Sequence, residues 1–463
     1  MKDIEEVYDA IVIGAGIGGL SCALHLAKSG KKVAVFEQHS VAGGSCSSFK
    51  RKGFTFDAGA HIFSDLNRIG LLNIILKLLD INFEFIRCTP DDRFIFPEFK
   101  YELPEHFDGF KKDIKEVFNN DSKCVDEFFK AVRTLLKSEN IDESLAYITY
   151  EELMNKFFSD SKTKKILSAQ WLFKGLTPNE MSSIDAITLL YSYWYGGSYY
   201  PIGGSQKFSD ALVNRLIELG GRMAFRSEVK EICVKDEKVS GVILNTGEVV
   251  KSKIVVNNGA VKNISTMLNE SYLNADVLNY IKKGRQSISL FTTYWGIKAD
   301  YSYVDGKSGW HFNNWDLNDK DVLLVTIPTL MDPSLAPCGH HIVETFSYAD
   351  TVQLEYFSQK KAFEMNKILD KLERIFGDFK DRVIVSEAST PATIEKYTMN
   401  SQGSVYGWAF TKEQAGKRRM DFNLGITGLY QVGHWTKPGA GITPVVISGR
   451  LVARQILGQE GLF

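Results

Sequence analysis

The feature that most constrains the fold is a glycine loop between two apolar segments near the start of the chain. Residues 10–13 form a short apolar run, as expected for a strand buried on both faces. The next glycines are spaced G-x-G-x-x-G, and small and apolar residues then recur at helical period up to Ala27. A second apolar segment, 32–36, ends in Glu37, 18 residues after Gly19. This order of strand, glycine loop, helix, strand and acid predicts a dinucleotide-binding unit.

Each part of this unit suits a dinucleotide. The glycines permit a tight turn, a close approach of the backbone to a pyrophosphate, and close packing of the helix on the strand. The open N–H groups of the first helical turn face the phosphates. The Glu37 carboxylate suits the two hydroxyls of an adenosine ribose. The predicted cofactor-binding residues of this unit are Gly14, Gly16, Gly18, Gly19, Glu37 and Gln38.

A second glycine pair, Gly43 and Gly44, follows closely, with the hydroxyl residues Ser45 and Ser48 behind it. Small residues, hydroxyls and nearby cations predict that a further stretch of backbone runs along the same phosphates. A nicotinamide-binding domain would usually continue into its next crossover helix. Here the chain enters a short β-like segment instead, GFTFDAG at 53–59.

The string GGSCSS…GFTFDAG resembles the N-terminus of the FAD-dependent amine oxidase and phytoene desaturase superfamily. It is most similar to the carotenoid desaturase, carotenoid isomerase and retinol saturase branch. The resemblance implies FAD as the cofactor and makes the second glycine pair part of its binding site. Two later segments, starting at Pro201 and Gly428, resemble the other cofactor segments of that superfamily. Further cofactor-binding residues implied by the resemblance are Ala60, His61, Val229, Gly433, His434, Gly441, Ile442 and Thr443.

The C-terminal segment has a glycine-rich turn into a helix, which again aims N–H groups at an electron-rich target. The resemblance implies that this helix start lies under the flavin pyrimidine. One position departs from the superfamily, which usually has Asp or Glu after the glycine, whereas this chain has His434. An imidazole there could donate to a phosphate oxygen, lie neutral against the ribityl chain, or contact the substrate.

These segments predict an α/β fold in which a Rossmann-like FAD-binding domain is discontinuous and a mixed α+β domain binds the substrate. The FAD-binding domain would comprise 1–62, 199–261 and 396–463, and the substrate-binding domain 63–198 and 262–395. Aromatic residues gather in both insertions, which favours a long apolar or conjugated ligand, with ordinary core packing as the alternative. The predicted substrate-lining residues are Tyr191, Tyr193, Trp194, Tyr195 and Tyr294.

A flavin would carry most of the chemistry, by taking or giving a hydride or by assisting a double-bond rearrangement. His61 is the first candidate catalytic residue, because the resemblance places its segment beside the isoalloxazine and retinol saturases have a His at the same spacing. A neutral His61 could donate a proton to a carbanion-like carbon, and a hydrogen-bonded structural histidine is the alternative. His434 is the second candidate.

The leading hypothesis is an FAD-dependent oxidoreductase that desaturates, saturates or isomerises carbon–carbon double bonds of an isoprenoid or polyene. One alternative is an amine oxidase or a protoporphyrinogen oxidase-like enzyme. A second alternative is a non-catalytic, flavin-stabilised binding protein. A quinone, oxygen or NAD(P)H would serve as electron acceptor or donor.

Composition narrows the partners. With 55 basic and 56 acidic residues and no nucleic-acid motif, the chain is not expected to bind nucleic acid. Its six cysteines form no C-x-x-C pair, which suits a reducing cytoplasm, and no metal-ligand spacing is present. We expect no targeting segment and no membrane-spanning helix. The amphipathic segment 69–83 predicts either a core-facing helix or peripheral contact with the cytoplasmic membrane.

Overall fold

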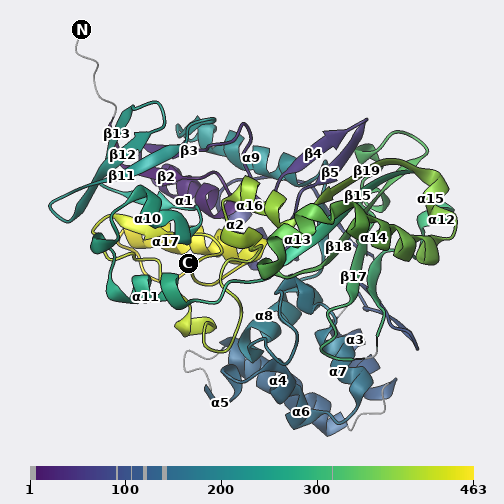
Figure 1. The fold of residues 1–463 in the computed structure, drawn as a ribbon. Coiled ribbons are helices and arrows are strands. Elements are labelled where there is room, and N and C mark those ends of the chain that lie inside the picture. Colours follow the sequence, from purple (N-terminus) through teal and green to yellow (C-terminus); the bar gives the residue numbers. More distant parts are fainter. Residues whose placement is uncertain are drawn as a thin grey trace.

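The structure is a computed structural model that describes residues 7–89, 92–105, 107–117, 122–137, 143–314 and 316–462. Its organising element is a five-stranded sheet whose strands come from distant parts of the chain (Figure 1). All neighbouring strands in this sheet are parallel. Across the sheet they are β10 (Arg222–Ala224), β3 (Val33–Phe36), β2 (Ala10–Ile13), β14 (Val255–Asn257) and β20 (Leu429–Gln431). The predicted fold class, with a discontinuous Rossmann-like part, is confirmed.

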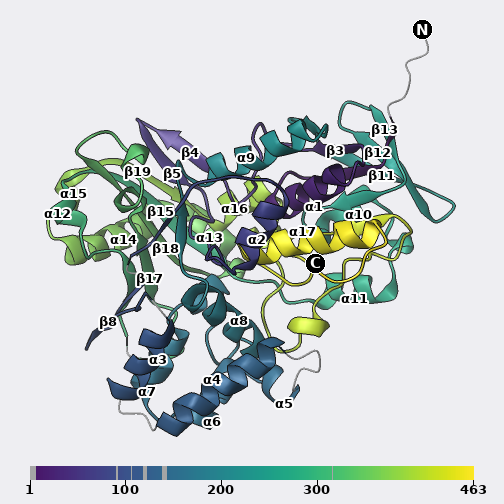
Figure 2. The same ribbon diagram turned by 180° about the vertical axis from the view of Figure 1, so that it is seen from behind.

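Successive side chains of a strand point to opposite sides of the sheet, and both faces of the parallel sheet are covered by other elements. Val12 and Val35 belong to the apolar cluster that includes helices α1 (Ile17–Lys28), α9 (Ser205–Glu218) and α17 (Ile442–Ile456). In both views α17 runs beside α1 (Figures 1 and 2). Ile11 and Phe36 pack on the other side, against a four-stranded sheet and helices α10 and α11. That layer comprises β1 (Val7–Tyr8), β13 (Val249–Ser252), β12 (Lys238–Leu244), β11 (Val229–Lys235), α10 (Ile264–Met267) and α11 (Ala275–Lys283).

A seven-stranded sheet forms the second half of the molecule, and all its pairs except β16 with β7 are antiparallel. Across it lie β19 (Val383–Ser389), β15 (Ser289–Lys298), β18 (His340–Ala349), β17 (Val322–Thr326), β16 (Gly309–Phe312), β7 (Arg93–Ile95) and β8 (Lys100–Glu102). Its companion helices are α12 (Tyr301–Val304), α13 (Leu354–Gln359), α14 (Lys361–Phe376), α15 (Phe379–Arg382) and α16 (Pro391–Thr398). Two-stranded ribbons are β4 (Ser48–Arg51) with β5 (Phe54–Asp57), and β6 (Phe85–Arg87) with β9 (Tyr199–Pro201).

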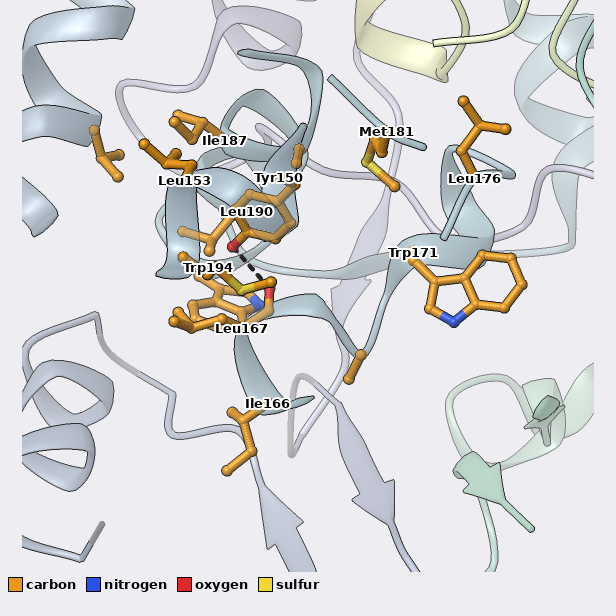
Figure 3. Close-up of a cluster of buried hydrophobic side chains, with 14 of the residues drawn as sticks. Tyr150, Leu153, Ile166, Leu167, Trp171, Leu176, Met181, Ile187, Leu190 and Trp194 are labelled. Carbon is orange, nitrogen blue, oxygen red and sulfur yellow. Dashed lines mark hydrogen bonds between the residues drawn. The ribbon is translucent and has the colours of Figure 1, made fainter. Parts of the chain in front are cut away.

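A helical layer lies below the seven-stranded sheet in Figure 1, far from β2 and β3. It comprises α3 (Phe107–Glu116), α4 (Ser122–Lys137), α5 (Glu143–Ala146), α6 (Tyr150–Phe157), α7 (Ser161–Ser168) and α8 (Ser183–Trp194). Its core packs large apolar side chains such as Leu153 and Leu190, and the Tyr150 hydroxyl donates to the Leu167 carbonyl at 3.1 Å (Figure 3). The cavity beside Tyr150 measures about 10 Å³, which holds one water molecule. A substrate does not fit there.

The amphipathic segment predicted at 69–83 forms α2 (Leu71–Leu78). Leu72 and Ile75 are buried in the cluster of the parallel sheet, as a core-facing helix requires. Among the described residues, no helix is long and apolar enough to cross a membrane. The domain boundaries near 62, 198, 261 and 395 stay a prediction.

Candidate functional site

The predicted glycine loop lies at the carboxyl edge of the parallel sheet, between β2 and α1. Gly14 has a φ of +89°, a conformation that glycine adopts without a steric penalty. No described side chain caps the first turn of α1, and this turn contains no acid. Its N–H groups therefore stay available at the positive end of the helix dipole, where a phosphate binds.

The second glycine pair lies against the first loop. The Gly43 N–H donates to the Ala15 carbonyl at 2.8 Å, and a Cβ on Gly44 would lie 3.6 Å from the Cα of Gly16. The GFTFDAG segment returns to the same place, because the Ala60 N–H donates to the Ser45 carbonyl at 2.9 Å. The two glycine motifs therefore form one continuous backbone surface.

Ser48 joins two of the predicted cofactor segments. Its hydroxyl donates to the Asp57 carboxylate at 2.7 Å and accepts the Gln206 N–H at 3.0 Å. The other carboxylate oxygen of Asp57 accepts the Tyr200 hydroxyl at 2.7 Å. Since Gln206 and Tyr200 belong to the second segment, Ser48 and Asp57 hold that segment to the first.

Glu37 is buried at the end of β3, and both of its carboxylate oxygens accept backbone N–H groups. The donors are Ala15 at 2.8 Å and His39 at 2.9 Å. Each oxygen keeps a further lone pair, so the contact of Glu37 with a ribose stays a prediction. The neighbouring Gln38 amide nitrogen lies 3.3 Å from Nε2 of His39.

The start of the second segment's strand lies at this same end of the site. The Ser227 N–H donates to the Glu37 carbonyl at 2.8 Å, two residues before Val229 begins β11. Val229 is buried. Val229 therefore lies near Glu37, the residue predicted to hold the adenosine ribose. The contact of the Val229 backbone with the adenine stays a prediction.

Asn258 is a site residue that the sequence reasoning missed. Its side-chain amide fills the space between the glycines: a Cβ on Gly16 would lie 2.7 Å from Nδ2, and Cβ atoms on Gly18 and Gly433 would lie 2.8 and 2.9 Å from Oδ1. Nδ2 also donates to the Gly14 carbonyl at 3.3 Å. The sequence does contain a signal for this residue, namely two consecutive asparagines where the apolar strand ends. β14 ends beside β2, so these asparagines lie at the edge of the sheet where ligands bind.

The third segment repeats the geometry of the first. Gly441 has a φ of +119° at the start of α17, and no described side chain caps the first turn, which includes Ile442 and Thr443. The Gly433 N–H donates to the Ser448 hydroxyl at 3.0 Å. A Cβ on Gly449 would collide with the Gly18 carbonyl, so α1 and α17 touch through their backbones. The structure therefore offers two uncapped helix starts.

His61 is buried, and its ring stacks on Phe346 of β18 with centroids 4.7 Å apart. Nδ1 lies 2.8 Å from the Gly59 carbonyl oxygen, which only accepts, so Nδ1 carries the proton. Burial lowers the pKa of His61, although the Gly59 carbonyl and Asp57 oppose this shift. No described group pairs with the buried Nε2. Neutral His61 therefore presents a lone pair at Nε2, which accepts a proton and cannot donate one.

His434 follows the Gly433 turn. Burial, reinforced by the charge of Arg419, lowers the pKa of His434 to about 4, so the ring is neutral at pH 7. A Cβ on Gly407 would lie 2.6 Å from its Cδ2, and no described group pairs with Nε2. A neutral ring in this place suits an uncharged part of a cofactor or an apolar substrate, and either role stays a prediction.

Buried charges support the loop between His434 and α17. Arg419 donates to the His434 carbonyl at 3.0 Å and to the Thr436 carbonyl at 3.3 Å. Lys174 Nζ lies 3.5 Å from the Ala440 carbonyl, and burial lowers its pKa to about 8. Burial raises the pKa of Asp185, which is partly offset by Lys174 and Arg419. Sequence reasoning missed this group because its members lie far apart along the chain.

The aromatic residues predicted on α8 lie on different faces of that helix. Tyr191 and Tyr195 stack with centroids 4.8 Å apart, and Tyr195 is exposed. Tyr193 stacks on Phe173 at 5.1 Å. Trp194 points into the helical layer (Figure 3), and its Nε1 donates to the Gln170 side chain at 3.0 Å. Trp194 thus packs in the core, which was the alternative to a substrate-lining role. A substrate-lining role of Tyr191, Tyr193 and Tyr195 stays a prediction.

Tyr294, on β15, lies in a buried polar cluster between the two halves. Its hydroxyl donates to the Ala58 carbonyl at 3.1 Å. In the neighbouring strand, Oε1 of Glu344 accepts the Asp57 N–H at 2.9 Å, and no described group pairs with Oε2. Burial, followed by the charge of Asp57, raises the pKa of Glu344 well above its usual range. Glu344 is therefore a buried acid that holds its proton more readily than a surface glutamate, and the sequence did not signal it.

Comparisons with known proteins agree with this geometry. Residues 17–457 match the family model described as flavin containing amine oxidoreductase. Prolycopene isomerase 1, chloroplastic, of an Oncidium hybrid cultivar is 29% identical, over 99% of this chain and 85% of that protein. The 1-hydroxycarotenoid 3,4-desaturase of Flavobacterium sp. (strain P99-3) is 26% identical, over 96% and 98%.

The fold is also found among solved structures. A crystal structure of an oxidoreductase from Methanosarcina mazei superposes with a TM-score of 0.71 at 19% identity, covering 97% of this chain and all of that one. At this identity the likeness concerns the fold alone.

Proposed function

The chain belongs to the flavin-containing amine oxidoreductase family, and we propose that it binds FAD and acts on carbon–carbon double bonds of a long apolar polyene. The observation that carries the cofactor assignment is the pair of uncapped helix starts, α1 and α17, whose helices touch where Gly449 meets the Gly18 carbonyl. Gly449, which touches α1 at Gly18, lies about 10 Å along α17 from its start. This offset suits a cofactor with an extended ribityl chain between its phosphates and its ring.

The chain's own residues would hold the cofactor as follows. The N–H groups at the start of α1 and the glycine pair at 43–44 would face the pyrophosphate. Glu37 would hold the adenosine ribose, and the start of α17 would place its positive dipole end against the electron-rich edge of the ring. Bound flavin supplies hydride transfer or assistance to double-bond rearrangement.

Two observations support a polyene as the substrate. The relatives are named as a prolycopene isomerase and a carotenoid desaturase, so both names refer to carotenoids. At the junction of the two halves, the buried His61 ring also stacks on Phe346, and burial lowers the pKa of His61. A long hydrocarbon needs such surroundings and few polar contacts. The reaction would be isomerisation, desaturation or saturation.

The test of the cofactor assignment is release of the flavin by acid precipitation of purified protein. We expect free FAD in the supernatant, because no Cys or His matches a flavin-linkage motif in the sequence. Colour retained in the pellet would contradict non-covalent binding, and colourless native protein would contradict the assignment.

The test of the reaction is anaerobic incubation of oxidised and photoreduced protein with prolycopene, quinones and amines. We expect prolycopene to be converted and amines to leave the oxidised flavin unchanged. Reduction by amines would favour an amine oxidase. A flavin inert to all compounds would favour a binding protein. The same panel identifies whether a quinone exchanges electrons with the flavin, and separate additions of oxygen to the photoreduced protein and of NAD(P)H to the oxidised protein test the other two.

We also propose that the protein works in the cytoplasm and draws its substrate from a membrane surface. Beside α2, Ile69 and Leu78 expose 60% and 42% of their surface, as a helix edge that meets lipid would. Co-sedimentation with phospholipid vesicles tests this, and we expect Leu78→Ser to reduce it. Equal binding of both proteins would overturn the membrane contact.

A further inference from the structure

Asp65 lies four residues after His61 and has a left-handed backbone, with a φ of +60°. Residues other than glycine occupy this conformation rarely and persist in it where neighbouring structure holds them. Two glycines do so here. A Cβ on Gly70 would collide with the Asp65 carbonyl, and a Cβ on Gly196 would lie 2.9 Å from both the N and the Oδ1 of Asp65. The backbone of Asp65 is therefore packed from two sides, and Gly196 also lies against its carboxyl.

Hydroxyl groups surround the Asp65 carboxyl. Ser64 donates to Oδ2 at 3.1 Å, and the hydroxyls of Ser192 and Thr443 also lie close enough to lower the pKa of this carboxyl. Burial raises the pKa of Asp65, and the three hydroxyls partly oppose this rise. No cation among the described residues acts on the carboxyl. Since 9% of the residue stays accessible, Asp65 holds a proton more readily than a surface aspartate without being fully enclosed.

Asp65 lies where the two halves of the molecule meet. On one side is Thr443, the second residue of α17, whose hydroxyl also donates to the Ser64 carbonyl at 3.3 Å. On the other side Ser192 belongs to α8, between Tyr191 and Tyr193. Burial raises the pKa of both tyrosines, and the charge of Asp65 adds to this. The titratable groups that face the carboxyl are thus neutral phenols.

We propose that Asp65 is the acid that protonates the conjugated chain of the substrate. This rests on the proposed function, and it assigns to Asp65 the proton transfer that the sequence assigned to His61. A donor other than His61 is needed, because His61 binds its own proton to the Gly59 carbonyl and presents a lone pair.

The step is balanced within the substrate and the carboxyl group. Asp65 transfers its proton to one carbon of a double bond, whose π electron pair forms the new C–H bond and leaves an allylic cation. The former double bond is now a single bond, and rotation about it exchanges the cis and trans arrangements. The carboxylate then removes a proton from the same carbon, the double bond forms again, and Asp65 recovers its acid form. No electrons are gained or lost.

The main test compares Asp65→Asn with the wild type, using prolycopene as the substrate. Asn keeps the size of the side chain and tolerates a left-handed backbone, but it has no acidic proton. We expect unchanged FAD content and a loss of turnover of about 10²–10⁴-fold. In D₂O the wild-type product should gain deuterium at the isomerised bond.

Asp80→Asn is the matched control, because Asp80 also has a positive φ, of +54°, but lies exposed in ion pairs with Lys28 and Arg215. It should retain FAD and turnover. His61→Gln is the competing variant. Turnover within a fewfold of wild type in Asp65→Asn, or loss of turnover with His61→Gln alone, would overturn the assignment to Asp65.

A second variant guards against misfolding of Asp65→Asn. Ser192→Ala removes a hydroxyl that lowers the pKa of Asp65, so the fall of turnover with rising pH should move to higher pH. Bound-flavin absorbance should show the same shift without substrate. An unchanged pH profile would overturn the proposal. A wild type with neither flavin nor turnover would overturn the proposed function as well, which distinguishes the two failures.

Discussion

The carboxyl edge of the parallel sheet and the helical layer are built by opposite means. At the sheet edge the chain offers backbone N–H groups, glycines in close contact and a single amide, that of Asn258. In the helical layer large side chains such as Trp194 fill the interior, and the cavity there holds one water. The sheet edge can bind a ligand through its backbone only where side chains are absent, whereas the helical layer is stable only where side chains fill its volume.

The largest effect should come from emptying the helical layer. Trp194→Ala should lower the free energy of unfolding by about 3–5 kcal/mol, because it leaves a cavity and an unpaired Gln170. Flavin per folded protein should stay constant, since the sheet edge is distant. Chemical denaturation and flavin absorbance measure the two. Tyr301→Ala, at a side chain 60% exposed, should change stability by less than about 0.5 kcal/mol. Loss of flavin from folded Trp194→Ala protein would show that the sheet edge depends on the packing of the helical layer.

The next effect should come from adding one methyl group to the sheet edge. Gly449→Ala places a Cβ against the Gly18 carbonyl and should cost about 3 kcal/mol, together with flavin. Gly30→Ala is the control, because Gly30 has a φ of +80° with no described atom near its Cβ. It should cost about 1 kcal/mol and no flavin. If thermal denaturation gave the same loss of stability for both variants, the contact between Gly449 and the Gly18 carbonyl would add nothing to the backbone strain that Gly30→Ala measures.

A smaller effect should come from the one carboxylate of the edge. Glu37→Ala leaves the Ala15 and His39 N–H groups unpaired and removes the proposed ribose contact. We expect FAD affinity to fall by about 1–3 kcal/mol, measured by titration of the apoprotein. Glu218→Ala, at an exposed position on α9, should bind FAD as the wild type does. Unchanged affinity in Glu37→Ala would place the ribose elsewhere.

The smallest effect concerns the polar cluster between the two regions. The pKa of Glu344 is raised in the folded protein, so its stabilising contribution is complete below its unfolded pKa of about 4.3 and is lost as pH rises towards the folded value. Between these values the free energy of unfolding should fall by about 1.4 kcal/mol per pH unit from this group. Glu344→Gln should remove that slope in denaturation curves recorded over about the first pH unit above the unfolded pKa. An unchanged slope would show that Glu344 is ionised when folded.

The same contrast explains what the sequence could predict. Gly14, Gly43 and Gly441 were recognisable because each belongs to a short local motif. In such a motif, glycine permits a backbone conformation or a close approach that other residues hinder. Asn258, Asp65 and Glu344 act through neighbours that are distant along the chain, and their types are common in loops and strands. Their positions follow only when the sheets are assembled. The tyrosines of α8 were found as a group, but helical geometry distributes them over several faces.

The strand order of the parallel sheet also has a consequence for protein synthesis. β14 pairs with both β2 and β20, so the sheet gains its last strand only when residues 429–431 have been made. At about 5–20 residues per second, on the order of half a minute separates the first strand from the last. During that time α1 lacks the cover of α17, and β14 has an unpaired edge from its own synthesis until β20 is made. A ribosome stalled near residue 425 would therefore carry an aggregation-prone chain, so the synthesis of β20 and α17 is the step at which a chaperone would matter most.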